Sequence, residues 1–216
     1  MLLSEIWKQY ALYTRLYGRV FLWYLPFQLC SIPMYLCILL GIFWDRQQPR
    51  QALLCFLSTY TLLSGIMVFL DTSGMHYGYA PLTVHSFLWH FLLIGLGICA
   101  GIIQSREREI PKARPFLRAT GIFLLCCGIA EALNLALDRY DVINMFYINP
   151  HYPMEQLVYR EMLTVLPNGT VILIYIGTII LGAGIIDRIW YIWRKRAAQS
   201  ERQEVDISQN RPGRAR

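Results

Sequence analysis

Five long stretches of this sequence carry few or no charged residues, and they constrain the fold more than any other feature. They cover residues 20–44, 51–70, 82–103, 116–137 and 170–193. Each is long enough to cross a hydrocarbon core, which takes about 20 helical residues. Only 16% of the 216 residues are charged, whereas an average soluble domain has about 25%. The sequence therefore predicts an all-α, polytopic transmembrane helix bundle with five spans.

Basic residues between the spans predict how the chain is oriented. The connections 45–50 and 104–118 and the tail from residue 194 hold two, five and seven Lys or Arg, whereas 71–81 and 138–169 hold none and two. Because positive charge gathers on the cytoplasmic side, we expect a multi-pass protein of a bacterial plasma membrane with a cytoplasmic C-terminus. The same distribution explains the net charge of +6 without a nucleic-acid partner.

The two ends of the chain differ from the spans. Residues 1–19 mix charges with aromatic and aliphatic side chains, which predicts an interfacial amphipathic helix or a partial sixth helix. They contain no uninterrupted apolar core, so we expect no signal peptide. Residues 197–216 are polar and lack apolar periodicity, and we expect a disordered basic cytoplasmic tail. The transmembrane helical domain is therefore predicted over residues 1–196.

Three polar side chains are predicted at similar depth in the outer half of the bundle. Cys30, His90 and Glu131 lie about 15, 12 and 9 Å from the outer ends of their spans, at a rise of about 1.5 Å per residue. Polar groups at such depth are unfavourable in lipid and mark candidate sites. A thiol and an imidazole within reach of each other form a nucleophile and its general base.

Two helix faces are predicted to point away from lipid. In the run 82–103, His90 shares a face with Gly97 and Gly101, a small-residue pattern that lets another helix approach closely. We therefore expect a possible homo-oligomer contact through these glycines. The run 116–137 and the residue after it carry one polar stripe at helical spacing, formed by Cys127, Glu131, Asn134 and Asp138.

The run 20–44 contains Pro26 and Pro33, whose rings remove backbone hydrogen bonds that lipid cannot replace. We therefore expect a distorted helix whose freed carbonyl groups find polar partners. The distortion also matters for Gln28, because a straight helix would point Gln28 about 200° away from Cys30.

Structural interpretations of the same residues stay open. All six cysteines lie within the predicted spans, where a cysteine is usually a small packing residue. A buried histidine commonly makes a helix–helix hydrogen bond, and Glu131 is compatible with a protonated carboxyl bonded to a neighbour. No loop has a metal-ligand spacing and no nucleotide-binding loop is present, so we expect no metal and no cofactor.

Three short segments occur in the order LPFQLC (residues 25–30), HSFLWH (residues 85–90) and NMF (residues 144–146). This pattern resembles that of the YwaF-like bacterial integral membrane proteins, which are similar to eukaryotic polytopic membrane phospholipid acyltransferases. The resemblance implies that Cys30 is an acyl-carrying nucleophile and that His90 or His85 is its base. The family often has a histidine where this chain has Gln28, and it usually has additional N-terminal membrane sequence.

We therefore expect a membrane-embedded lipid acyltransferase or acyl hydrolase that acts on membrane lipids. Cys30 and His90 would be catalytic, and the substrate would be positioned by Gln28, His85, Glu131 and Asn134. One alternative is a non-catalytic transporter or small-molecule sensor with a polar path along the run 116–137. Another is a scaffold that packs with partner proteins through Gly97, Gly101 and the tail.

Overall fold

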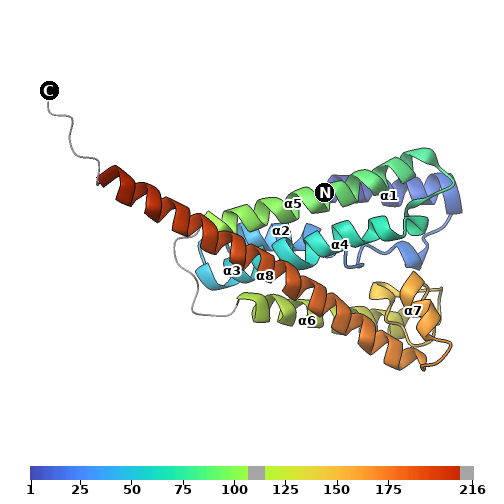
Figure 1. Cartoon of the computed structure of the whole chain (residues 1–216). Helices are drawn as coiled ribbons and strands as arrows, with labels where there is room; N and C mark the ends of the chain where they lie inside the picture. Colours follow the sequence, from blue (N-terminus) through green and yellow to red (C-terminus); the bar gives the residue numbers. More distant parts are fainter. Residues whose placement is uncertain (107–114, 210–216) are drawn as a thin grey trace.

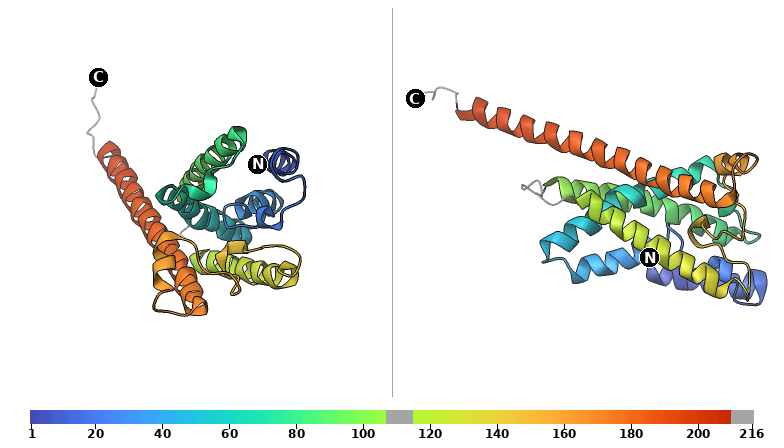
Figure 2. Two further views of the ribbon diagram at one scale, coloured as in Figure 1. Left: turned by 90° about the vertical axis from the view of Figure 1, so that its right-hand side faces the viewer. Right: turned by 90° about the horizontal axis from the view of Figure 1, so that it is seen from below.

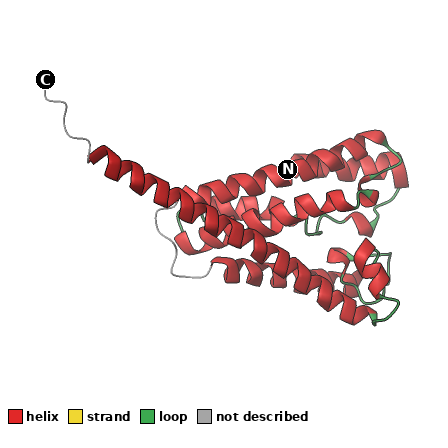
Figure 3. Ribbon diagram, viewed as in Figure 1, coloured by secondary structure: helices red, strands yellow, loops and turns green. Residues whose placement is uncertain are grey.

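The computed structural model describes residues 1–106 and 115–209, and within these residues every regular element is a helix (Figure 3). The long helices run in similar directions and form an elongated bundle, and α8 extends beyond its end (Figure 1). Hydrophobic residues of α2, α3, α6, α8 and the loop at residues 143–148 form the main core.

Four helical stretches of the described chain are long and apolar enough to cross a membrane. The first, Gln47–Leu70, combines α3 (Gln47–Phe56), the π-helix η3 (Leu57–Thr61), α4 (Leu62–Met67) and the 3-10 turn η4 (Val68–Leu70). The others are α5 (Ala80–Arg106), α6 (Pro115–Leu137) and the part Asn168–Ala197 of α8 (Asn168–Gln209). The chain is an all-α membrane protein, and four of the predicted spans are confirmed as long apolar helices.

The predicted span at residues 20–44 is not one helix, which corrects the expected number of long spans. Most of residues 18–31 form turns and irregular backbone with one 3-10 turn, η2 (Leu22–Tyr24), and the helix α2 (Ile32–Ile42) has only 11 residues. At about 1.5 Å per residue such a helix crosses only about half of a hydrocarbon core. Pro26 cannot donate a helical hydrogen bond, whereas Pro33 lies in the first turn of α2, where its missing N–H is harmless.

The carbonyl groups of this irregular segment find the polar partners that the prolines predicted. The Tyr35 hydroxyl donates to the Pro26 carbonyl at 2.8 Å. The indole N–H of Trp89 donates to the Cys30 carbonyl at 3.0 Å, and the Gln9 amide donates to the Tyr24 carbonyl at 2.7 Å. Side chains from α1, α2 and α5 therefore hold the segment in place.

The N-terminal residues form a helix that packs with one face against the side of the bundle, while Leu3, Ile6 and Tyr10 on it are exposed. α1 (Leu2–Ala11) continues into the π-helix η1 (Leu12–Tyr17), and Gly18 ends it with a left-handed φ of 64°. α1 begins beside the middle of α5 and runs toward one end of the bundle (Figure 1). The Ser4 hydroxyl lies 2.6 Å from Nε2 of His85, and Met1 packs near Met34. α1 is amphipathic and is not one of the long apolar helices, so the interfacial helix and the partial sixth helix both stay predictions.

The connections alternate between the two ends of the bundle as expected. The α2–α3 connection and the C-terminal part of α8 lie at one end, and the loops at residues 71–79 and 138–167 lie at the other (Figures 1 and 2). The second loop contains η6 (Met145–Tyr147) and α7 (Leu157–Met162), and the first contains η5 (Ser73–Met75). The tail expected to be disordered from residue 197 is drawn as helix to Gln209, and residues 210–216 lie outside the described residues.

The small-residue face of α5 is covered by the chain's own helices. Gly97 and Gly101 are both buried. A Cβ atom on Gly97 would lie 2.7 Å from Cβ of Leu62, and one on Gly101 would overlap the Trp190 ring. These glycines therefore serve contacts of α5 with α4 and α8 within one chain, rather than offering a free surface to a second copy.

Candidate functional site

Cys30 lies in a tight turn directly before α2. The N–H groups of Ser31 and Ile32 both donate to the Gln28 carbonyl, at 2.8 and 3.2 Å. Two prolines favour a turn at this position. Pro33 is suited to the first turn of a helix, and Pro26 disfavours helical backbone at the residue before it. Cys30 is half-buried, and its carbonyl is held by Trp89 of α5.

Three tyrosines from distant parts of the sequence lie in the same region as this cysteine. Tyr77, Tyr147 and Tyr175 each lie within electrostatic range of the Cys30 thiol. Cys30 and the three tyrosines are all half-buried.

His90 is buried on α5, and its contacts define which ring nitrogen is free. Only 8% of the residue is exposed. Its Nδ1 atom lies 2.8 Å from the carbonyl of Ser86, which is one helical turn earlier on α5. Since a carbonyl oxygen only accepts, Nδ1 carries the hydrogen and Nε2 of the neutral ring keeps its lone pair. Such a tautomer suits a general base.

An ion pair on α1 lies beside these groups and is not apparent from residue type alone. The Lys8 ammonium contacts Oε1 of Glu5 at 2.7 Å, and Glu5 is 3% exposed. Lys8 acts electrostatically on Cys30, His85 and His90. The available sequence signal was a pair of opposite charges three residues apart in a segment rich in apolar side chains.

His85 attaches α1 to α5. Besides its contact with Ser4, its ring lies against Trp7 of α1 at a centroid distance of 5.4 Å and stacks on Trp89 at 5.8 Å. The sequence suggested a substrate-positioning role, and the structure shows contacts with protein that orient Trp89, the residue that holds the Cys30 carbonyl.

Gln28 and Asn134, the two amides expected to position a substrate, both hold the loop at residues 144–146. The Gln28 amide accepts from the Phe146 N–H at 2.7 Å and donates to the Asn144 carbonyl at 3.1 Å. Asn134 accepts from the Met145 N–H at 2.6 Å and donates to the Met145 carbonyl at 3.2 Å. These contacts give both amides a loop-positioning role.

The held loop has an unusual backbone. Phe146 and Tyr147 have φ angles of 57° and 59°, a left-handed conformation that residues other than glycine rarely adopt. Phe146 is buried against Phe123 and Phe27, and the Tyr147 ring contacts Trp23. The hydrogen bonds from Gln28 and Asn134 offset the strain of this conformation.

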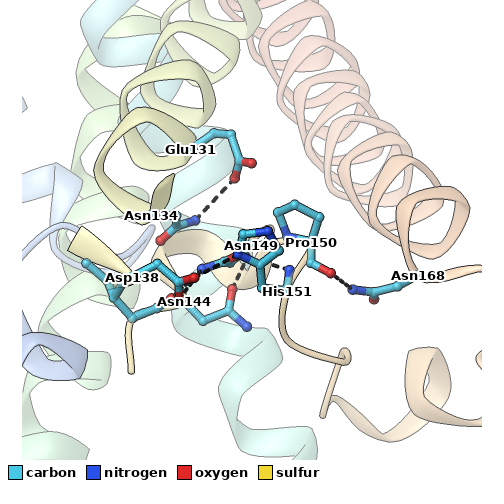
Figure 4. A network of polar contacts seen from close by, with 9 residues as sticks. Glu131, Asn134, Asp138, Asn144, Asn149, Pro150, His151 and Asn168 are labelled. Carbon is cyan, nitrogen blue, oxygen red and sulfur yellow. Dashed lines mark hydrogen bonds and ion pairs between the residues drawn. The ribbon is translucent and has the colours of Figure 1, made fainter. Parts of the chain in front are cut away.

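A polar network continues outward from this loop (Figure 4). Asn149 donates to the Ile143 carbonyl at 2.8 Å and to Asp138 at 3.4 Å, and Asp138 also contacts Nδ1 of His151 at 2.7 Å. Hydrogen bonds from His151 and Tyr152 hold the pKa of Asp138 below its ordinary value. Asn168, at the start of α8, donates to the carbonyls of Pro150 and Tyr152.

Glu131 is half-buried one turn before Asn134. Its carboxylate accepts from the Asn134 amide at 3.3 Å (Figure 4). The stripe on α6 therefore turns toward protein as predicted. Its members Asn134 and Asp138 support the outer loop, and Glu131 borders them.

The remaining cysteines are free thiols, and two of them, Cys126 and Cys127, are buried side by side in sequence on α6. Within residues 1–106 and 115–209, no group of three or more His, Cys, Asp or Glu side chains is arranged to hold a metal ion.

Comparison with protein-family models, with curated proteins and with solved structures finds no match. The class of protein is therefore defined by the fold, an all-helical membrane protein, and the site is interpreted from its own geometry.

Proposed function

We propose that this chain is a YwaF-like membrane protein that transfers or hydrolyses lipid acyl groups, with Cys30 as nucleophile and His90 as base. The single observation that carries the proposal is the position of Cys30 in a half-buried turn directly before α2, where Trp89 of α5, the residue next to His90, donates to its carbonyl. The sequence segments that resemble the YwaF-like family contain both residues.

The reaction would proceed in two balanced steps. Nε2 of His90 takes the proton of the Cys30 thiol, and the thiolate attacks the acyl carbonyl of a lipid ester. The carbon–oxygen ester bond breaks, the lysolipid oxygen takes the proton from His90, and a thioester remains on Cys30. A hydroxyl of a second lipid, or water, then attacks the thioester, loses its proton to His90 and restores the thiol.

The surroundings of Cys30 explain why a base and a nearby cation are needed. Burial disfavours a thiolate because the charge loses its hydration. The Lys8 ammonium compensates for part of that loss, whereas the Glu5 carboxylate paired with it acts in the opposite direction. Cys30 lies directly before the N-terminus of α2, where the helix dipole favours negative charge.

We also propose that the α2–α3 end of the bundle and the C-terminus face the cytoplasm of a bacterium. The excess of basic residues at that end supports this orientation. Cys30 and the loop at residues 138–167 then belong to the outer half, and membrane lipids are the partners.

A polar transport path along α6 is the less suitable interpretation. The Asn134 side chain is completely buried and bonded to the Met145 backbone. A side chain that holds a loop in this way does not line an open route for a solute.

The proposal is tested by acylation of the purified protein in lipid. Wild-type protein incubated with phospholipids should gain an acyl mass that neutral hydroxylamine removes, because hydroxylamine cleaves thioesters. Cys30→Ser should abolish this mass, and His90→Ala should slow its formation at least tenfold.

Cys37→Ser is the matched control, since Cys37 is also half-buried and lies on the adjoining helix α2. It should be acylated like wild type. A hydroxylamine-sensitive acyl mass that persists in Cys30→Ser, or no acyl mass in wild type with any phospholipid class, would contradict the proposal.

A further inference from the structure

A second group of buried polar side chains surrounds the π-helix η3, where the first long span is interrupted. Ser58, Thr59, Tyr60 and Thr61 of this segment have no exposed surface. A π-helical turn inside a membrane helix changes the hydrogen-bonding register of nearby carbonyl groups, and such turns are common at functional sites. The proposed acyl chemistry of Cys30 uses none of these residues.

Polar contacts connect η3 with two other helices. The Ser58 hydroxyl donates to Oε1 of Gln104 on α5 at 3.4 Å, and the indole N–H of Trp190 on α8 donates to the Ser58 carbonyl at 3.1 Å. The Cys55 thiol, one turn before Ser58, lies 3.8 Å from Oδ1 of Asp187 on α8 and also interacts with Gln104. The Cys55 thiol therefore connects Asp187 of α8 with Gln104 of α5, and the Ser58 hydroxyl contacts Gln104 from η3.

The charge of Asp187 lacks a contacting cation. In the described part of the chain its carboxylate forms no ion pair, and the thiol that contacts it is only a weak donor. Arg188 and Arg194 act on it from a distance, since Arg188 lies over the Tyr191 ring and Arg194 donates to the Trp190 carbonyl. A carboxylate within a membrane-spanning helix needs a compensating charge nearby.

We propose that this cluster is a binding site for a monovalent cation, Na⁺. Asp187 would supply the compensating charge, and Gln104 and Ser58 would supply neutral oxygen ligands. One carboxylate balances one monovalent cation, and hard cations prefer oxygen ligands of this kind. Membrane helices with interrupted hydrogen bonding also bind Na⁺ through oxygen ligands near the interruption.

The test is the thermal unfolding of the full chain in detergent at constant pH and ionic strength, with NaCl, KCl or N-methylglucamine chloride. Na⁺ should raise the unfolding temperature of wild type in a saturable manner, because a ligand that binds only the folded state stabilises it. Asp187→Asn should remove the Na⁺ effect. Asp45→Asn, which changes an exposed carboxylate, should keep it.

Ser58→Ala provides a second variant in case Asp187→Asn does not fold. It should raise the Na⁺ concentration needed for half of the effect about tenfold, as expected for loss of about 1.4 kcal/mol. Equal unfolding temperatures in the three salts would overturn the proposal, as would an unchanged Na⁺ effect in Asp187→Asn. A second series varies the pH without Na⁺. An unfolding temperature that changes with pH but not with Na⁺, and whose pH dependence Asp187→Asn removes, would assign the site to a proton and would also overturn the proposal.

Discussion

Gln28 and Asn134 use their side-chain amides as substitutes for backbone partners. Each amide both accepts from and donates to the peptide groups of the loop at residues 144–146. A loop with left-handed backbone at Phe146 and Tyr147 has no regular ladder to satisfy its N–H and C=O groups. Buried amides with both a donor and an acceptor satisfy these groups and select one conformation of the loop.

Gln28→Leu should destabilise the protein, because it leaves the Phe146 N–H and the Asn144 carbonyl without these partners. An unsatisfied buried group costs about 1–3 kcal/mol. The free energy of unfolding in detergent is the measurement, and cleavage of the loop at residues 138–167 by a protease should become faster. Gln48→Leu, at an exposed position, is the control, and equal stability of the two variants would contradict the role of Gln28.

Asp138 makes the stability of the outer loop depend on pH. Its hydrogen bonds hold its folded-state pKa below the ordinary value, so the stabilisation is complete above the unfolded pKa of about 3.9 and is lost as the pH falls toward the folded pKa. At neutral pH the free energy of unfolding in detergent should therefore be higher for wild type than for Asp138→Asn. The difference between the two proteins should shrink as the pH falls and vanish at the lowest pH. A difference between the two proteins that is the same at every pH would contradict this linkage.

Among the elements, close contacts of α5 decide how the long helices cross. The Trp190 ring of α8 lies against the backbone at Gly101, where a side chain would not fit. The indole N–H of the same ring donates to the Ser58 carbonyl of η3. Small residues allow such approach in membrane proteins, where packing rather than water drives helix association. One glycine therefore brings three spanning segments together.

Gly101→Ala should weaken this packing by about 1–3 kcal/mol, because the added methyl group overlaps the indole ring. Gly95→Ala is the matched control on the same helix, since no atom lies within 4 Å of the added Cβ. The unfolding temperatures of both variants in detergent give the comparison. A Gly101→Ala protein as stable as the control would show that the Trp190 ring does not lie against Gly101.

At the scale of the whole molecule, two irregular segments build the region around Cys30. The irregular residues 18–31 lead into the short helix α2. The loop after α6 contacts them through Gln28. Hydrogen bonds from Gln9 and Trp89 hold the first segment, and hydrogen bonds to Gln28 and Asn134 hold the second.

The proposed orientation predicts which ends of the bundle are accessible in intact bacteria. Tyr140→Cys, in the exposed loop after α6, should react with a membrane-impermeant maleimide in intact cells. Arg196→Cys, at the other end, should react only after permeabilisation, and the unsubstituted chain gives the background from the native cysteines. Labelling with the opposite preference would reverse the orientation.

The sequence by itself determined the class of the molecule and the positions of four long spans, because a hydrocarbon core demands about 20 apolar residues in each. It also showed that Pro26 and Pro33 would disturb the first predicted span, and that the α6 stripe would face protein, since both follow from local backbone chemistry and helical periodicity. The depth estimated for Cys30 assumed a continuous helix over residues 20–44, and the irregular backbone before α2 contradicts that assumption.

Only the tertiary structure decided the partners of the polar side chains. Gln28 and Asn134 bind a loop more than ten residues away in the sequence, Lys8 approaches Cys30 from another helix, and Asp187 reaches Cys55 across 132 positions. Periodicity gives the face on which a side chain lies, but not the segment that covers that face. That choice depends on how all the helices pack at once, and packing is a property of the whole bundle.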